Sequence, residues 1–301
     1  MKRFSLLPLL LAALAFSIKL LNPFGPTLMP IAFVISGEIG RGIEVSYWRT
    51  PDEAIARIKS SDADFYILPL TLGVNLKASG FDLILLGVHE WKVFYLVGPE
   101  GTKVWEDLKG KTVYVAHSRG TVLDVLLRMF LKKHGLSPDE DVKLVYAQPP
   151  EIVALFKAGK VHFAALPEPF VTVVLASGRG EIVLDFQEEW KKLTGLRSRI
   201  PIAGLFTTSK VLNERPGDVF YVEQTLRLST MMMNSDPRGA AELVSKITKI
   251  PSKILEASTK RMVFEYVPIE KCKKEVEEFL KVLKEEYPQG IKAIPGGEFY
   301  R

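Results

Sequence analysis

The sequence predicts an α/β protein built from two related lobes. Its length of 301 residues corresponds to about two domains of ordinary size, and 47% hydrophobic with 25% charged residues is a globular composition. Short apolar runs typical of buried parallel strands alternate with amphipathic helical stretches, as in α/β folds. The third observation is an internal repeat, because residues 50–69 and 148–167 align without a gap at an offset of 98.

The repeat predicts two β-α-β units. Seven of the twenty aligned positions are identical, and each copy starts its helix with proline, Pro51 or Pro149, followed by glutamate two residues later. An apolar run ending in Pro69 or Pro167 follows each helix, and strand candidates precede the helices at residues 43–48 and 142–147. Two unrelated units could have reached similar sequences by convergence, but the matched helix start, length and strand-ending proline favour related lobes.

The first seventeen residues have the pattern of a secretory leader. Lys2 and Arg3 precede a short apolar run, and residues 13–15 read Ala-Leu-Ala, an A-x-A cleavage pattern. The run is shorter than the roughly 18–20 residues that span a bilayer. A buried first strand or helix is the alternative, and an uncleaved leader could also act as a weak anchor. We expect residues 1–17 to be a signal peptide, with a first strand from Ile18.

Charge, cysteine content and motifs exclude several functional classes. The balance of 40 basic and 35 acidic residues gives +5 without a block of like charges, so no nucleic-acid partner is expected. A single cysteine, Cys272, excludes an intramolecular disulfide and a cysteine-based metal cluster. Hydrolase, P-loop and complete dinucleotide motifs are missing, and the four histidines lack metal-ligand spacing. We therefore expect no catalytic residue, no metal and no cofactor.

The candidate ligand-binding residues lie in the strand-to-helix turns. Ligands of such sheets bind beyond the carboxyl ends of the strands, and two facing lobes imply a cleft there. In the first half of the chain these residues are Asn22, Phe24, Gly25, Thr27, Leu70, Thr71, His89 and Trp91. In the second half they are Ser118, Arg119, Gly120, Thr121, Gln148, Glu168 and Phe170.

The charged candidates each allow two interpretations. The turn at residues 118–121 opens a helix, whose free N–H groups and dipole attract an anion, and Arg119 could add a bidentate contact. Alternatively, the turn is an ordinary cap with Arg119 in solvent. Glu168 could accept from a ligand amine or could hold its own turn through backbone N–H groups. His89 is better explained as a neutral hydrogen-bonding residue than as a metal ligand.

The aromatic candidates are also ambiguous. Phe24, Trp91 and Phe170 could stack on a ring or cover an alkyl chain, but aromatic residues near strand ends are more often core.

Several motifs occur in an order that resembles a known family. Residues 107–115 read DLKGKTVYV, and they are followed by Ser118-Arg119-Gly120-Thr121, Ala158-Gly159-Lys160-Val161 and Glu168-Pro169-Phe170. This order resembles the extracytoplasmic solute-binding proteins of ABC importers, in particular the nitrate, sulfonate, taurine and thiamine-precursor binders. One departure is His162, which stands where the family pattern G-x-V-D-A has aspartate. The subfamily and the ligand therefore stay open.

The resemblance implies an architecture of the periplasmic-binding-protein type II class. Two α/β lobes with mixed, mainly parallel sheets would be joined by two hinge strands. Lobe I would comprise residues 18–91 and 201–301, and lobe II residues 92–200. The hinge candidates are residues 93–98 and 201–207.

The resemblance also implies a function. We expect a non-enzymatic, monomeric receptor at the outer face of the cell membrane that captures a small anionic or heteroaromatic solute. It would present this solute to an ABC permease and ATPase. The alternative is a cytoplasmic enzyme on the same fold, such as a dehydratase-like enzyme of the menaquinone route, with Glu168 or His89 as its acid or base.

Overall fold

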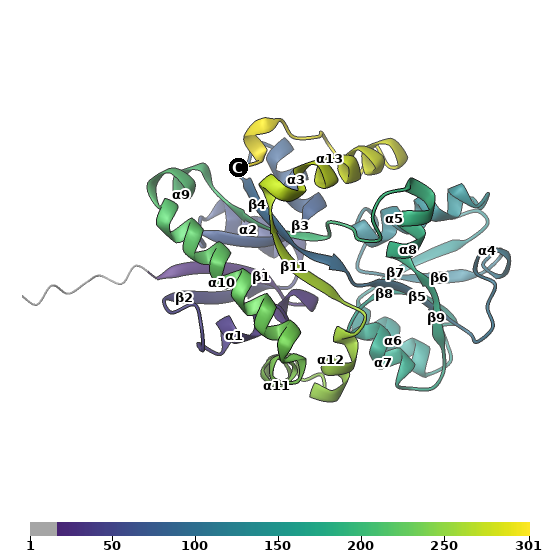
Figure 1. Cartoon of the computed structure of the whole chain (residues 1–301). Helices are drawn as coiled ribbons and strands as arrows, with labels where there is room; N and C mark the ends of the chain where they lie inside the picture. Colours follow the sequence, from purple (N-terminus) through teal and green to yellow (C-terminus); the bar gives the residue numbers. More distant parts are fainter. Residues whose placement is uncertain (1–16) are drawn as a thin grey trace, which may run out of the picture.

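A computed structural model describes residues 17–301, so the expected leader, apart from Ser17, lies outside the described residues. Two β-sheets lie side by side, each with helices packed against it, and two chain segments cross between them (Figure 1). Among residues 17–301, no helix is both long and apolar enough to cross a membrane.

Lobe I contains a six-stranded mixed sheet in the order β11-β4-β10-β3-β1-β2. Its three parallel strands are β1 (Ile18–Pro23), β2 (Ile43–Trp48) and β3 (Phe65–Pro69). The antiparallel part consists of β4 (Ile84–Lys92), β10 (Ala203–Thr207) and β11 (Val263–Pro268). The chain therefore returns to this sheet after it has built the second one.

Lobe II contains a five-stranded mixed sheet in the order β7-β6-β8-β5-β9. The parallel strands are β6 (Thr112–Ala116), β7 (Lys143–Ala147) and β8 (Phe163–Pro167). Strand β5 (Phe94–Gly98) runs antiparallel to β8, and the edge strand β9 (Glu181–Asp185) runs antiparallel to β5.

Helices connect these strands in both lobes. The first part of lobe I has η1 (Pro26–Leu28), α1 (Ala32–Ile35), α2 (Pro51–Lys59) and α3 (Leu70–Ala78). Lobe II has α4 (Val104–Asp107), α5 (Val122–Lys133), α6 (Pro149–Lys157), α7 (Phe170–Leu175) and α8 (Phe186–Thr194). The returning chain forms α9 (Ser209–Glu214), α10 (Pro216–Ser235), α11 (Pro237–Thr248), α12 (Ser252–Thr259), α13 (Ile269–Glu286) and η2 (Gly297–Phe299).

The structure confirms the two β-α-β units that the repeat predicts. Helices α2 and α6 are each nine residues long, and strands β3 and β8 are each five residues long and end at the equivalent prolines. The equivalence extends beyond the repeat, because lobe I read from β2 (β2-β1-β3-β10-β4) matches lobe II read from β7 (β7-β6-β8-β5-β9). Lobe I differs by one additional edge strand, β11.

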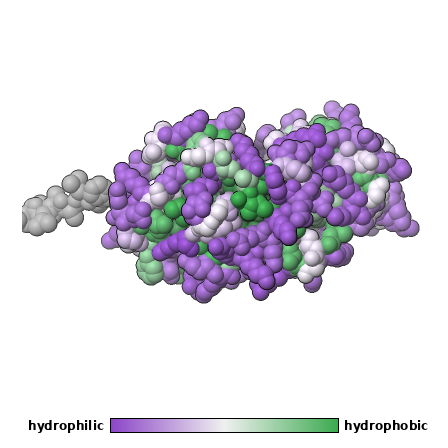
Figure 2. Space-filling view, turned by 90° about the horizontal axis from the view of Figure 1, so that it is seen from above, coloured by the Kyte–Doolittle hydropathy of each residue, from purple (hydrophilic) through white to green (hydrophobic). Residues whose placement is uncertain are grey.

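Two helices of the returning chain reach from lobe I to lobe II. Helix α13 packs on β4 and β11 of lobe I and contacts α5 of lobe II, while α12 contacts α7 of lobe II. In Figure 1 these two bridges lie at the top and at the bottom of the molecule, on either side of the crossing segments. Seen from above, the two lobes meet at a shallow indentation, and most of this face is hydrophilic (Figure 2).

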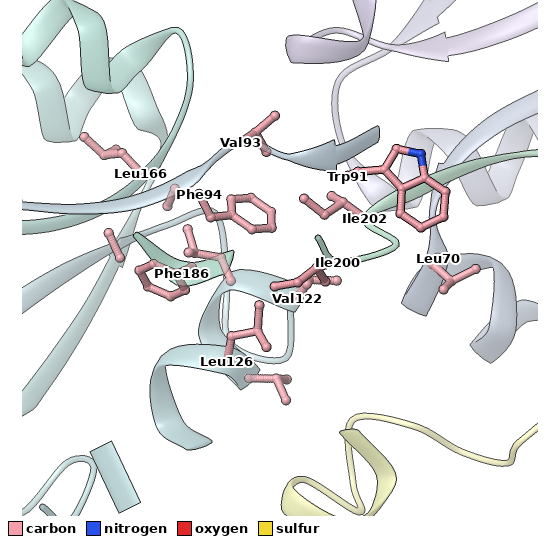
Figure 3. Packing of buried hydrophobic residues seen from close by; sticks show 14 of the residues in the cluster. Leu70, Trp91, Val93, Phe94, Val122, Leu126, Leu166, Phe186, Ile200 and Ile202 are labelled. Atoms are coloured by element: carbon pink, nitrogen blue, oxygen red, sulfur yellow. The ribbon is translucent and has the colours of Figure 1, made fainter. Parts of the chain in front are cut away.

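The crossing segments are hydrogen-bonded to each other and packed in a shared core. Ile200 donates its N–H to the carbonyl of Trp91, and Ile202 donates to that of Glu90, each at 2.9 Å. Buried side chains of both lobes surround this junction: Leu70 and Trp91 on one side, Val122 and Phe186 on the other (Figure 3). One hydrophobic cluster therefore continues from lobe I into lobe II.

Candidate functional site

The carboxyl ends of the parallel strands of both lobes point toward the crossing segments. In lobe I, Pro69 at the end of β3 pairs with Ala203, the first residue of β10 after the crossing. In lobe II, Pro167 at the end of β8 pairs with Phe94, the first residue of β5 after the other crossing. Because β1 runs parallel to β3, and β6 and β7 run parallel to β8, the two carboxyl edges face each other. We call them the facing edges; they carry the candidate site.

The lobe I facing edge holds a buried amide without a complete set of partners. The Asn22 side chain is fully buried, and its Nδ2 donates to the Thr27 hydroxyl at 3.0 Å and to the Pro23 carbonyl at 2.7 Å. Its Oδ1 is buried and accepts no hydrogen bond from the described residues. Leaving such an acceptor unpaired costs free energy, so a partner is expected.

Two neighbouring residues near the end of β4 also have side-chain atoms without a hydrogen-bond partner. His89 is 1% exposed and Glu90 is 4% exposed. Burial lowers the pKa of His89 to about 4 and raises the pKa of Glu90 to about 8, so both side chains are mainly neutral at pH 7. Nε2 of His89 and Oε1 of Glu90 have no hydrogen-bond partner among the described residues. A buried carboxyl group with no ion-pair partner is a frequent mark of a functional site.

The remaining lobe I candidates divide into core and surface. Leu70, Thr71 and Trp91 are buried, and the Trp91 indole donates to the Glu265 carbonyl at 2.8 Å, as expected for a structural side chain. Phe24 is half-buried, and the Arg49 guanidinium stacks 3.8 Å from its ring centre. A side chain at Gly25 would meet no atom within 4 Å, so the backbone here borders open space.

The lobe II facing edge is more exposed. Helix α5 begins after Thr121, as predicted, but the Thr121 hydroxyl donates to the Ser118 carbonyl instead of capping the helix. Gly120 has a φ of 86°, in the left-handed region that favours glycine, and its N–H donates to Asp124 Oδ2 at 2.7 Å. Ser118 and Gln148 are exposed, and Phe170 is half-buried.

Arg119 is directed toward other protein groups. Its guanidinium lies 3.5 Å from Asp139, and its side chain is 54% exposed. A hydrogen bond with Tyr287, which follows α13, raises the pKa of Arg119. The arrangement therefore agrees with the interpretation of an ordinary turn better than with a cationic ligand contact.

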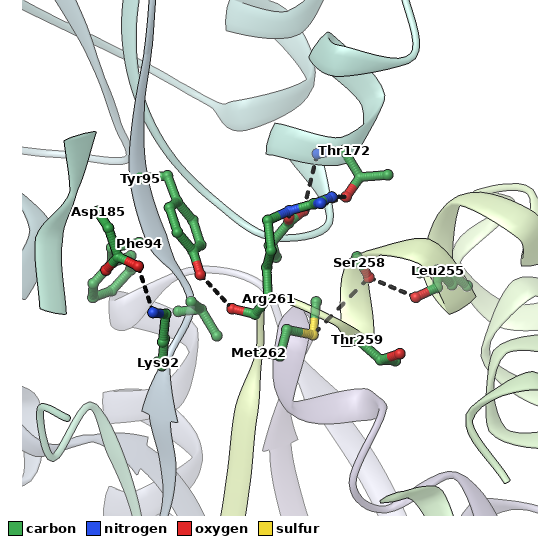
Figure 4. A network of polar contacts seen from close by, with 12 residues as sticks. Lys92, Phe94, Tyr95, Thr172, Asp185, Leu255, Ser258, Thr259, Arg261 and Met262 are labelled. Atoms are coloured by element: carbon green, nitrogen blue, oxygen red, sulfur yellow. Dashed lines mark hydrogen bonds and ion pairs between the residues drawn. The ribbon is translucent and has the colours of Figure 1, made fainter. Parts of the chain in front are cut away.

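Glu168 is the most completely bonded candidate. Its side chain is fully buried; Oε2 accepts from the Thr172 N–H at 2.9 Å and from the Thr172 hydroxyl at 2.8 Å. Oε1 pairs with the guanidinium of Arg261, a residue of the turn between α12 and β11 of lobe I. The Arg261 guanidinium also donates to the Thr172 hydroxyl (Figure 4). Both carboxylate oxygens are thus used within the protein, and Glu168 joins the two lobes.

A model of the NMT1-like family matches residues 68–248, which is more than half of the chain. The chain belongs to the NMT1-like family. A search of curated proteins returned no match to the sequence.

Solved structures share the fold of this NMT1-like protein. An ABC transporter structure from Parabacteroides distasonis has a TM-score of 0.80 and 24% identity, with 95% of this chain and 99% of that chain covered. The periplasmic aliphatic sulphonate-binding protein SsuA of Escherichia coli has a TM-score of 0.72 and 15% identity, covering 94% and 97% of the chains. The periplasmic nitrate-binding protein NrtA of Synechocystis PCC 6803 has a TM-score of 0.63 and 13% identity, covering 81% and 70%. These similarities establish the two-lobed fold.

Two residues of this NMT1-like protein matter at the facing edges although the sequence did not single them out as site residues. Glu90 stands next to the candidate His89, but a glutamate inside an apolar run gives no signal that its carboxyl group is unpaired. Arg261 lies 93 residues from Glu168, and no sequence pattern connects them. Within residues 17–301, no group of three or more potential metal ligands comes together.

Proposed function

We propose that this protein is an extracytoplasmic solute-binding receptor of an ABC importer. It would hold a small solute between the facing edges and present the closed form to a permease and an ATPase. The observation that carries the proposal is the set of unpaired buried polar atoms at the lobe I facing edge: Asn22 Oδ1, His89 Nε2 and Glu90 Oε1. The resemblance to sulphonate- and nitrate-binding proteins supports the same role.

The unpaired amide oxygen of Asn22 favours a solute that donates a hydrogen bond. An amide oxygen only accepts hydrogen bonds, so Asn22 Oδ1 requires an N–H or O–H donor. Arg119, the expected cationic contact, lies beside Asp139. Within the expected classes, an amine-bearing heteroaromatic solute or an aminosulfonate such as taurine therefore fits better than nitrate.

A thermal-shift panel tests this proposal. The mature protein is unfolded and refolded to remove bound solute, and its melting temperature is measured with nitrate, methanesulfonate, taurine and an aminopyrimidine. A ligand that binds only the folded state raises this temperature. We expect a rise with an amine-bearing compound, and the Asn22→Ala variant should lose it. No shift with any of these compounds would count against the receptor function.

The enzyme alternative has weaker support from the geometry. Its two candidate acid–base groups are Glu168, whose oxygens are both bonded within the protein, and His89, whose pKa burial lowers to about 4, so that it is a weak base. N-terminal sequencing of the native protein distinguishes the alternatives. Receptor function predicts a mature start near Ile18 outside the cell, whereas an intact Met1 in the cytosol would support the enzyme.

A further inference from the structure

A second concave site lies outside the facing edges, beside the segment that returns from lobe II to lobe I. It is a groove of about 770 Å³ between the end of α8, the following segment at residues 195–199, and α13. Its walls carry five cations and two carboxylates: Lys191, Arg197, Arg199, Lys271, Lys274, Glu275 and Glu278. We call it the return groove.

The two carboxylates of the return groove are already paired with groove cations. Arg199 holds Glu275 through two hydrogen bonds of 2.8 and 2.7 Å, and Lys274 lies 3.9 Å from Glu278. Arg199 is also stacked on the Trp91 ring, 4.2 Å from its centre, so the guanidinium is firmly placed. Arg199 also lies 3.3 Å from Glu265, which is outside the groove lining, so its charge is held by two carboxylates.

Three cations of the groove are left over. Lys191, Arg197 and Lys271 are exposed, and none of them has a carboxylate within ion-pair distance among residues 17–301. The backbone N–H groups of Arg197 and Ser198 also donate no hydrogen bond within this part of the chain. Cations together with free N–H and hydroxyl donors in one concavity are the chemistry that recognises an oxyanion.

We propose that the return groove binds a multivalent phosphate-bearing anion. Three cations without a carboxylate partner match a polyphosphate or phosphate ester better than a single carboxylate. Lys191 and Arg197 come from the lobe II side and Lys271 from α13, which packs on lobe I. An anion held by both sets joins the lobes outside the solute site, so it favours the arrangement in which they are close together. This site does not depend on which solute the facing edges bind.

Calorimetric titration of the mature protein with inorganic pyrophosphate at low ionic strength tests the proposal. We expect saturable binding that weakens as sodium chloride is added, and about a tenfold or greater loss of affinity in the Arg197→Ala/Lys271→Ala variant. The control variant, Lys160→Ala/Lys210→Ala, removes the same charge from two exposed lysines elsewhere. Unchanged melting temperatures of both variants show that they are folded.

A second arm identifies the source of the phosphate. Cosedimentation with phosphatidylglycerol vesicles that depends on Arg197 and Lys271, without pyrophosphate binding, would assign the groove to lipid headgroups. Pyrophosphate binding without cosedimentation would assign it to a soluble anion. The proposal is overturned if neither probe binds, or if the control variant loses as much affinity as the groove variant.

Discussion

The two facing edges are built from equivalent strands, yet their carboxyl groups differ in how completely they are hydrogen-bonded within the protein. Glu90 lies near the end of β4 in lobe I, and Asp185 ends β9, the equivalent strand of lobe II. Asp185 accepts from the N–H groups of Gln187 and Glu188 and pairs with Lys92, whereas Oε1 of Glu90 accepts nothing from the described residues. Glu168 of lobe II is likewise fully bonded.

This difference suggests a division of roles between the lobes. A carboxylate that is completely bonded within the protein stabilises the fold, whereas a buried carboxyl group without a hydrogen-bond partner costs free energy, a cost that proteins accept mainly at functional sites. If the protein binds a solute as proposed, we expect the lobe I facing edge, at Asn22 and Glu90, to determine its selectivity. The lobe II facing edge contributes the contact between the lobes through Glu168.

The largest effect should come from removing the partner of Glu168. Arg261→Ala leaves a fully buried carboxylate without its cation, and breaking a buried pair typically costs about 3–5 kcal/mol. We expect the free energy of unfolding, measured by urea denaturation, to fall by about 3 kcal/mol. Burial already raises the pKa of Glu168, so the variant should lose more stability at neutral than at acidic pH.

Two further variants make this result specific. Arg238→Ala breaks an exposed pair with Glu242, whose side chains are 75% and 56% exposed, and should cost under about 1 kcal/mol. Glu168→Gln in the Arg261→Ala background removes the stranded charge and should recover part of the loss. If Arg261→Ala and Arg238→Ala lower the free energy of unfolding equally, the buried Glu168–Arg261 pair contributes no more to stability than an exposed pair.

The second prediction concerns the unpaired Glu90. Its pKa of about 8 in the folded protein, against 4.5 normally, means that the folded protein keeps a proton that the unfolded chain releases. Stability therefore falls as the pH rises between these values. His89, with a pKa of about 4 against 6.5, acts in the opposite direction, but only below pH 6.5. We expect a loss of about 1.5 kcal/mol between pH 6.5 and 8 from the raised pKa of Glu90.

Denaturation curves at intervals over this range test the assignment. Glu90→Gln cannot ionise and should abolish the loss, while the exposed Glu44→Gln control should retain it. If Glu90→Gln and the wild type lose stability in parallel, another group is responsible for the titration. A bound solute that supplies a partner for the Glu90 carboxyl group should also reduce this dependence of stability on pH.

Much of the fold was predictable because it depends on local patterns. The strands at residues 43–48 and 65–69 and the helix at 51–59 follow from apolar periodicity and proline placement, and the offset of 98 transfers them to lobe II. The additional strand β11 was not predicted. It pairs with β4 across more than 170 residues of chain, and no local pattern specifies such a distant partner.

The candidate site was less predictable for the same reason. The sequence located the turns, but the state of each side chain depends on neighbours that are distant in the chain. Arg119 was an expected anion contact, yet Asp139 and Tyr287 surround it, and Glu168 is bonded to a residue 93 positions away. The unpaired state of Glu90 is visible only once its surroundings are known.

The smallest predicted effect tests how far the two repeat copies have diverged. Thr50 and Gln148 are equivalent positions, each preceding the proline that starts a helix, but only the Thr50 side chain accepts from the N–H three residues later, at 3.2 Å. Thr50→Ala should therefore lower the free energy of unfolding by about 1 kcal/mol. Gln148→Ala should change it by only a few tenths, because the glutamine makes no cap.

Gln148 already has the extended backbone of an N-cap, so Gln148→Thr should add a cap and stabilise lobe II by up to about 1 kcal/mol. Equal losses in the two alanine variants would show that Gln148 has a structural role at the lobe II facing edge. A loss of solute affinity in Gln148→Ala without a loss of stability would instead place this side chain against the ligand.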